Sequence, residues 1–270
     1  MKRLRRHAKD EASSLRPPWA WALTGALLGM AIVFTLTAPA RWLASGLARA
    51  SSGMLLLTDA QGSLWNGSAQ LQLTGGAGSQ DRTALPGRLQ WRLHPGLGHL
   101  SVAITSSCCT PNGPVSLRLS PRWGGAHASL SDSHTVWPAA VLSGLGTPWN
   151  TIQPQGELSL RTQNLHITWA SGRASVSGRA DITARNMSSR LSTLRPMGSY
   201  QAHITGGDAV ALNLSTLEGG LRLSGSGQWV GGRLRFSGEA TAAPGLEGQL
   251  ANLLNIIGRR QGDRAIISLG

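Results

Sequence analysis

The two cysteines of the chain are adjacent, and they are the first residues whose type and spacing suggest chemistry. Neighbouring Cα atoms are about 3.8 Å apart, whereas those of bridged cysteines usually lie about 4.4–6.8 Å apart. A vicinal disulfide between Cys108 and Cys109 is therefore strained, but the turn-rich segment Thr110–Pro114 can hold a constrained loop. We expect this bridge in an oxidising compartment; two reduced or partner-linked thiols are the alternative.

Histidines and carboxylates show no spacing that is typical of an active site or a metal site. The seven histidines are scattered, and none lies in an HExxH arrangement. Acidic residues beyond position 16 stand singly, so no carboxylate pair is indicated. The sequence also lacks a G-x-S-x-G elbow, a P-loop and a G-x-G-x-x-G after a strand. We therefore expect a protein that is not an enzyme, with no catalytic residue, metal or cofactor.

A long uncharged segment near the N-terminus predicts a transmembrane helix over 17–40. Its apolar run is about as long as the ~20 residues that a helix needs to cross a bilayer. Trp19 and Trp21 at its start and Trp42 just past its end suit the two membrane interfaces. A cleaved signal peptide is the alternative, because Ala38-Pro39-Ala40 resembles a cleavage site, although the run exceeds the usual length of about 7–15 residues.

The charges that flank this helix predict its direction. Residues 1–16 hold six Lys or Arg against two acids, and such a tail stays in the cytoplasm. We expect a cytoplasmic tail over 1–16, a connector over 41–60 and a β-rich periplasmic domain over 61–270. The predicted location is the cell inner membrane, in a single pass.

Gly25 and Gly29 lie one helical turn apart within the predicted span. Such a pair permits close approach of a second helix, and thereby a homo-oligomer. A glycine pair without a packing role is the alternative, because small residues are frequent in membrane helices.

Positive charge is spread thinly over the rest of the chain. The formal charge is +13, but its Arg residues mostly occur singly and without stacked aromatic residues. We therefore expect no nucleic-acid partner.

Alternation of apolar and polar residues dominates the part after the predicted helix, and it predicts a mainly β fold with an antiparallel sheet. Ser68–Thr74 and Arg88–Leu93 alternate strictly, and the pattern recurs to Leu234–Phe236. Three short helical segments are also predicted, over 138–145, 188–194 and 246–257.

The order of several short segments resembles the type II secretion system protein N family, also called general secretion pathway protein N. The segments that carry the likeness, beside the basic tail and anchor, are Asp59–Ala69, Leu89–Trp91, Leu145–Gly156, Leu194–Tyr200 and Leu253–Gly258. The resemblance covers nearly the whole chain. Members of this family are in turn distantly similar to the AsmA-like envelope proteins.

This resemblance implies a non-enzymatic accessory or scaffold component in the inner-membrane part of the machine that exports folded periplasmic proteins. The implied partners are other inner-membrane secretion components. The AsmA likeness implies a curved sheet and, as the alternative function, a membrane-anchored module that binds or transfers membrane lipid.

Overall fold

A computed structural model describes residues 19–170, 173–207, 209–230 and 233–270. The tail expected over 1–16 lies outside these described residues. The chain forms two compact units, Met1–Ala38 and Pro39–Gly270.

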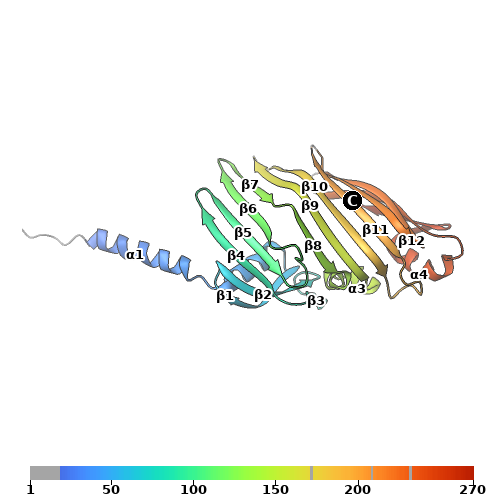
Figure 1. The fold of residues 1–270 in the computed structure, drawn as a ribbon, viewed down its shortest axis with the longest axis horizontal. Helices are drawn as coiled ribbons and strands as arrows, with labels where there is room; N and C mark the ends of the chain where they lie inside the picture. Colours follow the sequence, from blue (N-terminus) through green and yellow to red (C-terminus); the bar gives the residue numbers. More distant parts are fainter. Residues whose placement is uncertain (1–18, 171–172, 208, 231–232) are drawn as a thin grey trace, which may run out of the picture. The chain divides into compact units, whose positions relative to one another are not determined.

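The first unit contains helix α1, Trp19–Leu36 (Figure 1). Its mean hydropathy is 1.8, and it is the helix of the described residues that is long and apolar enough to cross a membrane. The hydroxyls of Thr24 and Thr35 each donate to a carbonyl oxygen four residues earlier, at 2.7 Å. These bonds keep the polar groups satisfied within the helix, as a hydrocarbon environment requires. A signal sequence near the N-terminus can meet the same criteria of length and composition, so the cleaved signal peptide stays the alternative prediction.

The second unit is built on one antiparallel sheet, to which 16 strands of the described residues belong (Figure 1). Neighbouring strands follow the order β1-β2-β4-β5-β6-β7-β9-β10-β11-β12-β13-β14-β16-β15, with β3 beside β2 and β8 beside β9. The strands are β1 (Leu55–Gly62), β2 (Asn66–Thr74), β3 (Arg82–Ala84), β4 (Leu89–Gly96), β5 (His99–Ser106), β6 (Val115–Arg122), β7 (Gly125–Leu130), β8 (Ser133–Pro138), β9 (Gln155–Ala170), β10 (Arg173–Ser188), β11 (Gly198–Gly207), β12 (Ala211–Gly219), β13 (Leu221–Val230), β14 (Arg233–Ala242), β15 (Arg259–Gln261) and β16 (Arg264–Leu269).

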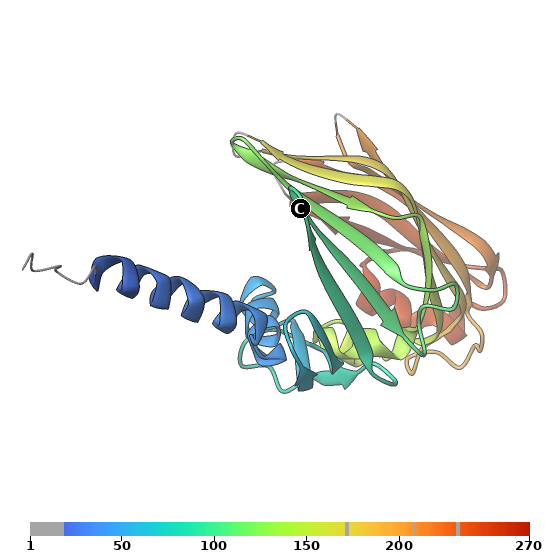
Figure 2. The same ribbon diagram turned by 60° about the vertical axis from the view of Figure 1, so that its left-hand side comes forward.

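Short helices pack against one face of this sheet, which we call the inner face. They are α2 (Ala40–Ala50), η1 (Ala139–Leu145), α3 (Trp149–Ile152) and α4 (Glu247–Ile257). Figure 2 shows that the sheet curls, with η1 and α4 gathered at one end of it. The helices therefore cover only part of the inner face.

Three apolar cores lie between these helices and the sheet. Ala40 of α2 packs with Trp91 of β4, and Val141 of η1 packs with Leu71 of β2. The largest core surrounds α4, whose leucines 250, 253 and 254 are almost fully buried. Burying a leucine side chain contributes about 1.5–3 kcal/mol, so the spacing of these leucines is sufficient reason for α4 to dock.

The structure confirms the mainly β fold and two of the three predicted helical segments, which are η1 and α4. The sheet already begins at Leu55, within the segment 41–60 that we expected to be a connector. That segment also contains α2.

The helix predicted over 188–194 is wrong. The hydroxyl of Ser189 accepts the N–H of Leu191 at 3.1 Å, and that of Ser192 accepts the N–H of Leu194 at 3.1 Å. The same hydroxyls donate to carbonyl oxygens of α3 and α4, those of Ile152 and Gln249. Serine side chains thus take the backbone partners that a helix would have used.

Candidate functional site

The inner face carries an apolar surface beyond the region that the helices cover. Strand pairing places Leu100 opposite Leu119, Leu119 opposite Ala128, and Ala128 opposite Ile167, so these residues share one face. We call this region the distal inner surface; its apolar residues are Leu100, Val102, Leu117, Leu119, Leu130, Leu165, Ile167, Val176 and Leu212.

The side chains of the distal inner surface are half-buried, and none of them belongs to the three cores. Contiguous apolar surfaces of this kind often mark sites that contact another apolar surface or an apolar ligand. Because these side chains are hydrocarbon, the surface supports binding and offers no group for catalysis.

Three buried polar atoms on the inner face have no hydrogen-bond partner among the described residues: Thr135 Oγ1, Trp137 Nε1 and the Tyr200 hydroxyl. Trp137 pairs with Leu158, and Tyr200 lies in the same cross-strand row beyond Ala184. Burial raises the pKa of the Tyr200 hydroxyl above its usual value, so this group stays protonated. Each of the three residues can therefore donate a hydrogen bond to a bound polar atom.

A fork in the sheet forms a second, polar site. Strands β7 and β8 both pair with β9, but β7 also pairs with β6, whereas β8 does not. The two strands are separated at Asp132, whose Oδ1 accepts the N–H of Asn164 at 2.7 Å. Asn164 has φ +48, a left-handed conformation that asparagine tolerates. The irregular backbone at Asn164 of β9, bonded to Asp132 between β7 and β8, thus lies where β7 and β8 separate.

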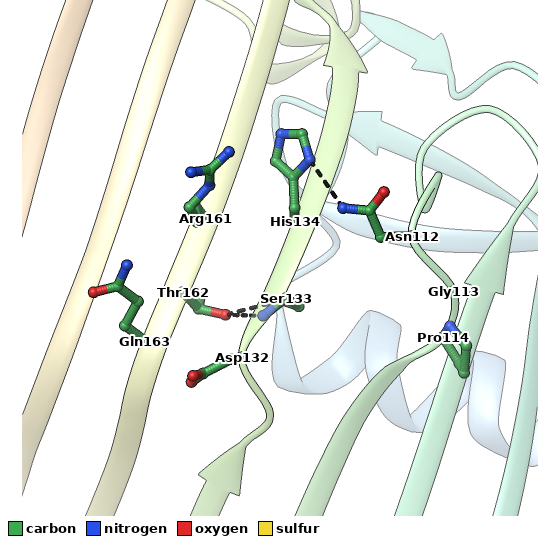
Figure 3. A pocket seen from close by; sticks show the side chains of 9 residues that line it. All are labelled: Asn112, Gly113, Pro114, Asp132, Ser133, His134, Arg161, Thr162 and Gln163. Carbon is green, nitrogen blue, oxygen red and sulfur yellow. Dashed lines mark hydrogen bonds between the residues drawn. The ribbon is translucent and has the colours of Figure 1, made fainter.

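Polar side chains line the pocket at this fork, which has a volume of about 300 Å³ (Figure 3). Thr162 holds Ser133 in place in this pocket. The Thr162 hydroxyl bonds the Ser133 hydroxyl at 2.9 Å and accepts the N–H of Ser133 at 3.2 Å. On the opposite side, Asn112 Nδ2 lies 3.5 Å from His134 Nδ1. The lining residues are Asn112, Gly113, Pro114, Asp132, Ser133, His134, Arg161, Thr162 and Gln163.

This pocket does not bring a nucleophile and a base together. The Ser133 hydroxyl is engaged by Thr162, whereas the His134 ring contacts Asn112. Elsewhere in the described part of the chain, no group of three His, Cys, Asp or Glu side chains is placed to hold a metal ion. The structure therefore describes the fork as a pocket lined by polar side chains.

The loop that carries the cysteines bonds to the edge of β8 that does not pair with β9. The carbonyl of Cys109 accepts the N–H of Val136 at 2.9 Å, and the Cys109 side chain is buried beside Val141 in a core. The two sulfur atoms of Cys108 and Cys109 are joined in the structure. Their oxidation state in the cell stays a prediction.

An ion pair ties β1 to the residue that precedes β4. Arg88 donates to Asp59 Oδ2 through Nη1 and to the Asp59 carbonyl through Nη2, the latter at 2.7 Å. Hydrogen bonds from Arg88 and Gln61, together with the charge of Arg88, hold the pKa of the Asp59 carboxyl below its usual value. Arg88 also donates to the Ser68 hydroxyl at 3.2 Å, so it joins three strands.

Gly25 and Gly29 lie on α1, and the space beside each is open within the described residues. A role of this pair in helix packing stays a prediction.

Sequence reasoning missed the fork, because its residues come from segments far apart in the chain. The only local signal was Asp132 between two alternating segments, which marks a turn as readily as a fork.

These features define a class of protein: an antiparallel β-sheet unit that follows one apolar helix, with a partly exposed apolar surface on its inner face and a polar pocket at the fork. Within that class, the sequence matches the family described as type II secretion system (T2SS), protein N, over residues 54–267. The chain belongs to this family, and its sheet is almost coextensive with the match. Comparisons with curated proteins and with solved structures found no match.

Proposed function

We propose that this protein is a non-enzymatic accessory or scaffold component of the type II secretion machinery in the inner membrane. The observation that carries the proposal is the family match, which spans the sheet from Met54 to Ile267. An apolar helix N-terminal to the matched region supports attachment to a membrane. The described surfaces are suited to binding, since they hold apolar rows and a polar pocket.

Deletion and complementation test this proposal. Loss of the gene should abolish or strongly reduce export of folded enzymes through the outer membrane, and the full chain should restore it. Unchanged export of every secreted enzyme would contradict the proposal. A catalytic role would depend on polar side chains of the fork pocket, whereas the proposed role does not. The variants His134→Ala and Ser133→Ala should therefore complement the deletion as well as the natural chain does.

We propose further that the N-terminus is cytoplasmic and that 39–270 lies in the periplasm. The support is the excess of Lys and Arg in 1–16 and the joined cysteines, which suit an oxidising compartment. Alkaline phosphatase fused after Gly270 should be active, and a green fluorescent protein at the same position should be dark. The reverse pattern would refute this topology.

A second candidate function is the binding of membrane lipid by the inner face. It is favoured by the distal inner surface together with the buried, unpartnered donors of Trp137 and Thr135. Apolar residues would contact acyl chains, and the donors would bond a polar head. Lipid extraction of the full chain, purified in a detergent that exchanges, tests it: Val102→Asp combined with Leu117→Asp should lose bound phospholipid, while the surface variant Arg179→Gln should retain it.

A further inference from the structure

The loop that joins β10 to β11 is anchored between α3 and α4. The hydroxyl of Ser189 donates to the Ile152 carbonyl of α3 at 2.6 Å, and the hydroxyl of Ser192 donates to the Gln249 carbonyl of α4 at 2.9 Å. Both serines are buried, at 1% and 4% exposure. Two buried anchors so close together hold the loop backbone in place, so the side chains that project from it have a fixed origin.

A pocket of about 510 Å³ lies between this loop and the exposed side of α4. Three exposed residues of the loop line one side of it, and three exposed residues of α4 line the other. We call this cavity the loop pocket; the residues in question are Arg190, Thr193, Arg195, Gly248, Gln249 and Asn252.

The loop pocket is cationic. Arg190 and Arg195 carry a permanent positive charge, and no carboxylate of the described residues lines the cavity. Glu247, the acidic residue of α4, does not line it, and its Oε1 accepts the N–H of Gly245 at 3.1 Å. Arg190 Nη1 donates to Gln153 Oε1 at 3.1 Å, but neither arginine forms an ion pair within the described part of the chain. Both guanidinium groups can therefore bind an anion.

Neutral hydrogen-bond donors complete the lining. Thr193 supplies a hydroxyl, and the side chains of Gln249 and Asn252 each supply an amide NH₂ group. A phosphate group presents several acceptor oxygens in three dimensions, so it can bond donors on both sides of a cavity, whereas a planar carboxylate suits a single guanidinium fork. The volume falls within the range of small-molecule sites, about 300–1,000 Å³, so it also has room for an organic group attached to the phosphate.

We propose that the loop pocket binds a phosphate ester of a small polyol. Arg190 and Arg195 contact the phosphate, and the amides of Gln249 and Asn252 bond the hydroxyls of the polyol. This site goes beyond the proposed role in secretion, and it uses no residue of the fork or of the distal inner surface. A soluble phosphate monoester and the headgroup of a phospholipid share this chemistry, and two arms of the experiment distinguish them.

Isothermal titration calorimetry of the full chain, in a non-ionic detergent and a phosphate-free buffer, tests the proposal. The first arm uses glycerol 3-phosphate, a soluble monoester. The second arm uses glycerophosphoglycerol, which is the diester headgroup of phosphatidylglycerol without its acyl chains. We expect one site per chain, and the probe that binds more tightly assigns the source.

Arg190→Gln combined with Arg195→Gln should weaken binding of the tighter probe about tenfold or more, because hydrogen bonds between charged groups are the strong ones. The matched control is Arg118→Gln combined with Arg122→Gln, which removes the same charge from exposed positions of β6 outside the loop pocket. This control should bind like the natural chain. Melting temperatures of both double variants should equal that of the natural chain, because all four arginines are exposed.

Gly248→Leu tests the position of the site without removing a charge. The space beside Gly248 is open within the described residues, so a leucine fits there and fills part of the loop pocket. Leucine favours a helix more than glycine does, so α4 should stay folded and the melting temperature should not fall. We expect this variant to weaken binding of the tighter probe about tenfold or more.

Binding of either probe that is lost in both the arginine variant and Gly248→Leu supports the proposal. Absence of binding by both probes overturns it, as does binding that survives in either of these variants. An equal loss in the β6 control also overturns it, because the effect would then follow net charge. Malonate that binds as tightly as the tighter probe would show that the pocket recognises carboxylates and would contradict the assignment of a phosphate.

Discussion

At the scale of single residues, Tyr200 is the clearest case of a polar group that the fold leaves unsatisfied. Its ring is buried in the largest core, but its hydroxyl has no partner among the described residues. An unpaired buried hydroxyl destabilises a folded protein by about 1–3 kcal/mol.

Tyr200→Phe should therefore raise the free energy of unfolding by about 1 kcal/mol, because it removes the hydroxyl and keeps the ring. Tyr200→Ala should lower it by about 3 kcal/mol or more through the cavity that it leaves. Chemical denaturation of the chain in detergent measures both. If Tyr200→Phe is destabilising, the hydroxyl has a partner such as lipid or water, which would favour the ligand-binding view of the inner face.

The pair of Asp59 and Arg88 predicts a dependence of stability on pH. Because the pKa of Asp59 is lowered in the folded state, its stabilising contribution is complete above the unfolded value of about 3.9 and is lost as pH falls further. Arg88→Gln should lower the melting temperature at pH 7 and do so less at pH 3. Part of the deficit should persist at pH 3, since Arg88 also bonds Ser68 and the Asp59 carbonyl.

Arg92→Gln is the control for this comparison, because Arg92 is an exposed arginine on β4, the strand that begins directly after Arg88. It should melt like the natural chain at both pH values. An Arg88→Gln deficit of equal size at pH 7 and pH 3 would show that the charge of Asp59 contributes nothing.

At the scale of elements, local periodicity decided how much was predictable. The alternation in Ser68–Thr74 continues for the whole of β2, and the leucines of 246–257 share the buried face of α4, so both elements followed from side-chain spacing. The same reasoning wrongly predicted a helix over 188–194, because the hydroxyls of Ser189 and Ser192 bond segments that lie far away in the chain. The fork escaped prediction for the same reason.

The element that holds the cysteines yields a prediction about redox state. Intact mass spectrometry under non-reducing conditions should give a mass 2 Da below that of the reduced chain, and an alkylating reagent should add no group before reduction. Two groups added without reductant would establish free thiols. Mixed species of higher mass would instead indicate bonds to a partner.

The same loop should depend on Cys109 more than on Cys108 for packing. Cys109 is 1% exposed in a core with Leu71 and Val141, whereas Cys108 is half-buried at its margin. In the reduced chain, Cys109→Ser should therefore destabilise by about 1–3 kcal/mol, and Cys108→Ser should destabilise less. Equal effects in denaturant titrations of the reduced chain would show that burial of the Cys109 side chain contributes no more to stability than that of Cys108.

At the scale of the whole molecule, we assign separate roles to the helix α1 and to the sheet. The sheet packs its own cores within Pro39–Gly270, so it has the apolar contacts to fold by itself. The helix α1 buries no residue in the described structure, and the task that we propose for it is attachment to the membrane. If attachment is its only task, the identity of the helix should not matter.

Replacing the segment 17–38 by an unrelated single-pass helix of equal length should therefore restore secretion in a deletion strain to the level of the natural chain. Secretion of 39–270 behind a cleavable signal peptide should not, since the sheet would leave the membrane surface. Gly25→Ile with Gly29→Ile tests the same point within the natural helix, with Ala31→Ile as a control on its opposite face. Full complementation by the glycine variant assigns α1 to tethering, whereas loss of secretion by it alone assigns the glycine pair to a helix–helix contact.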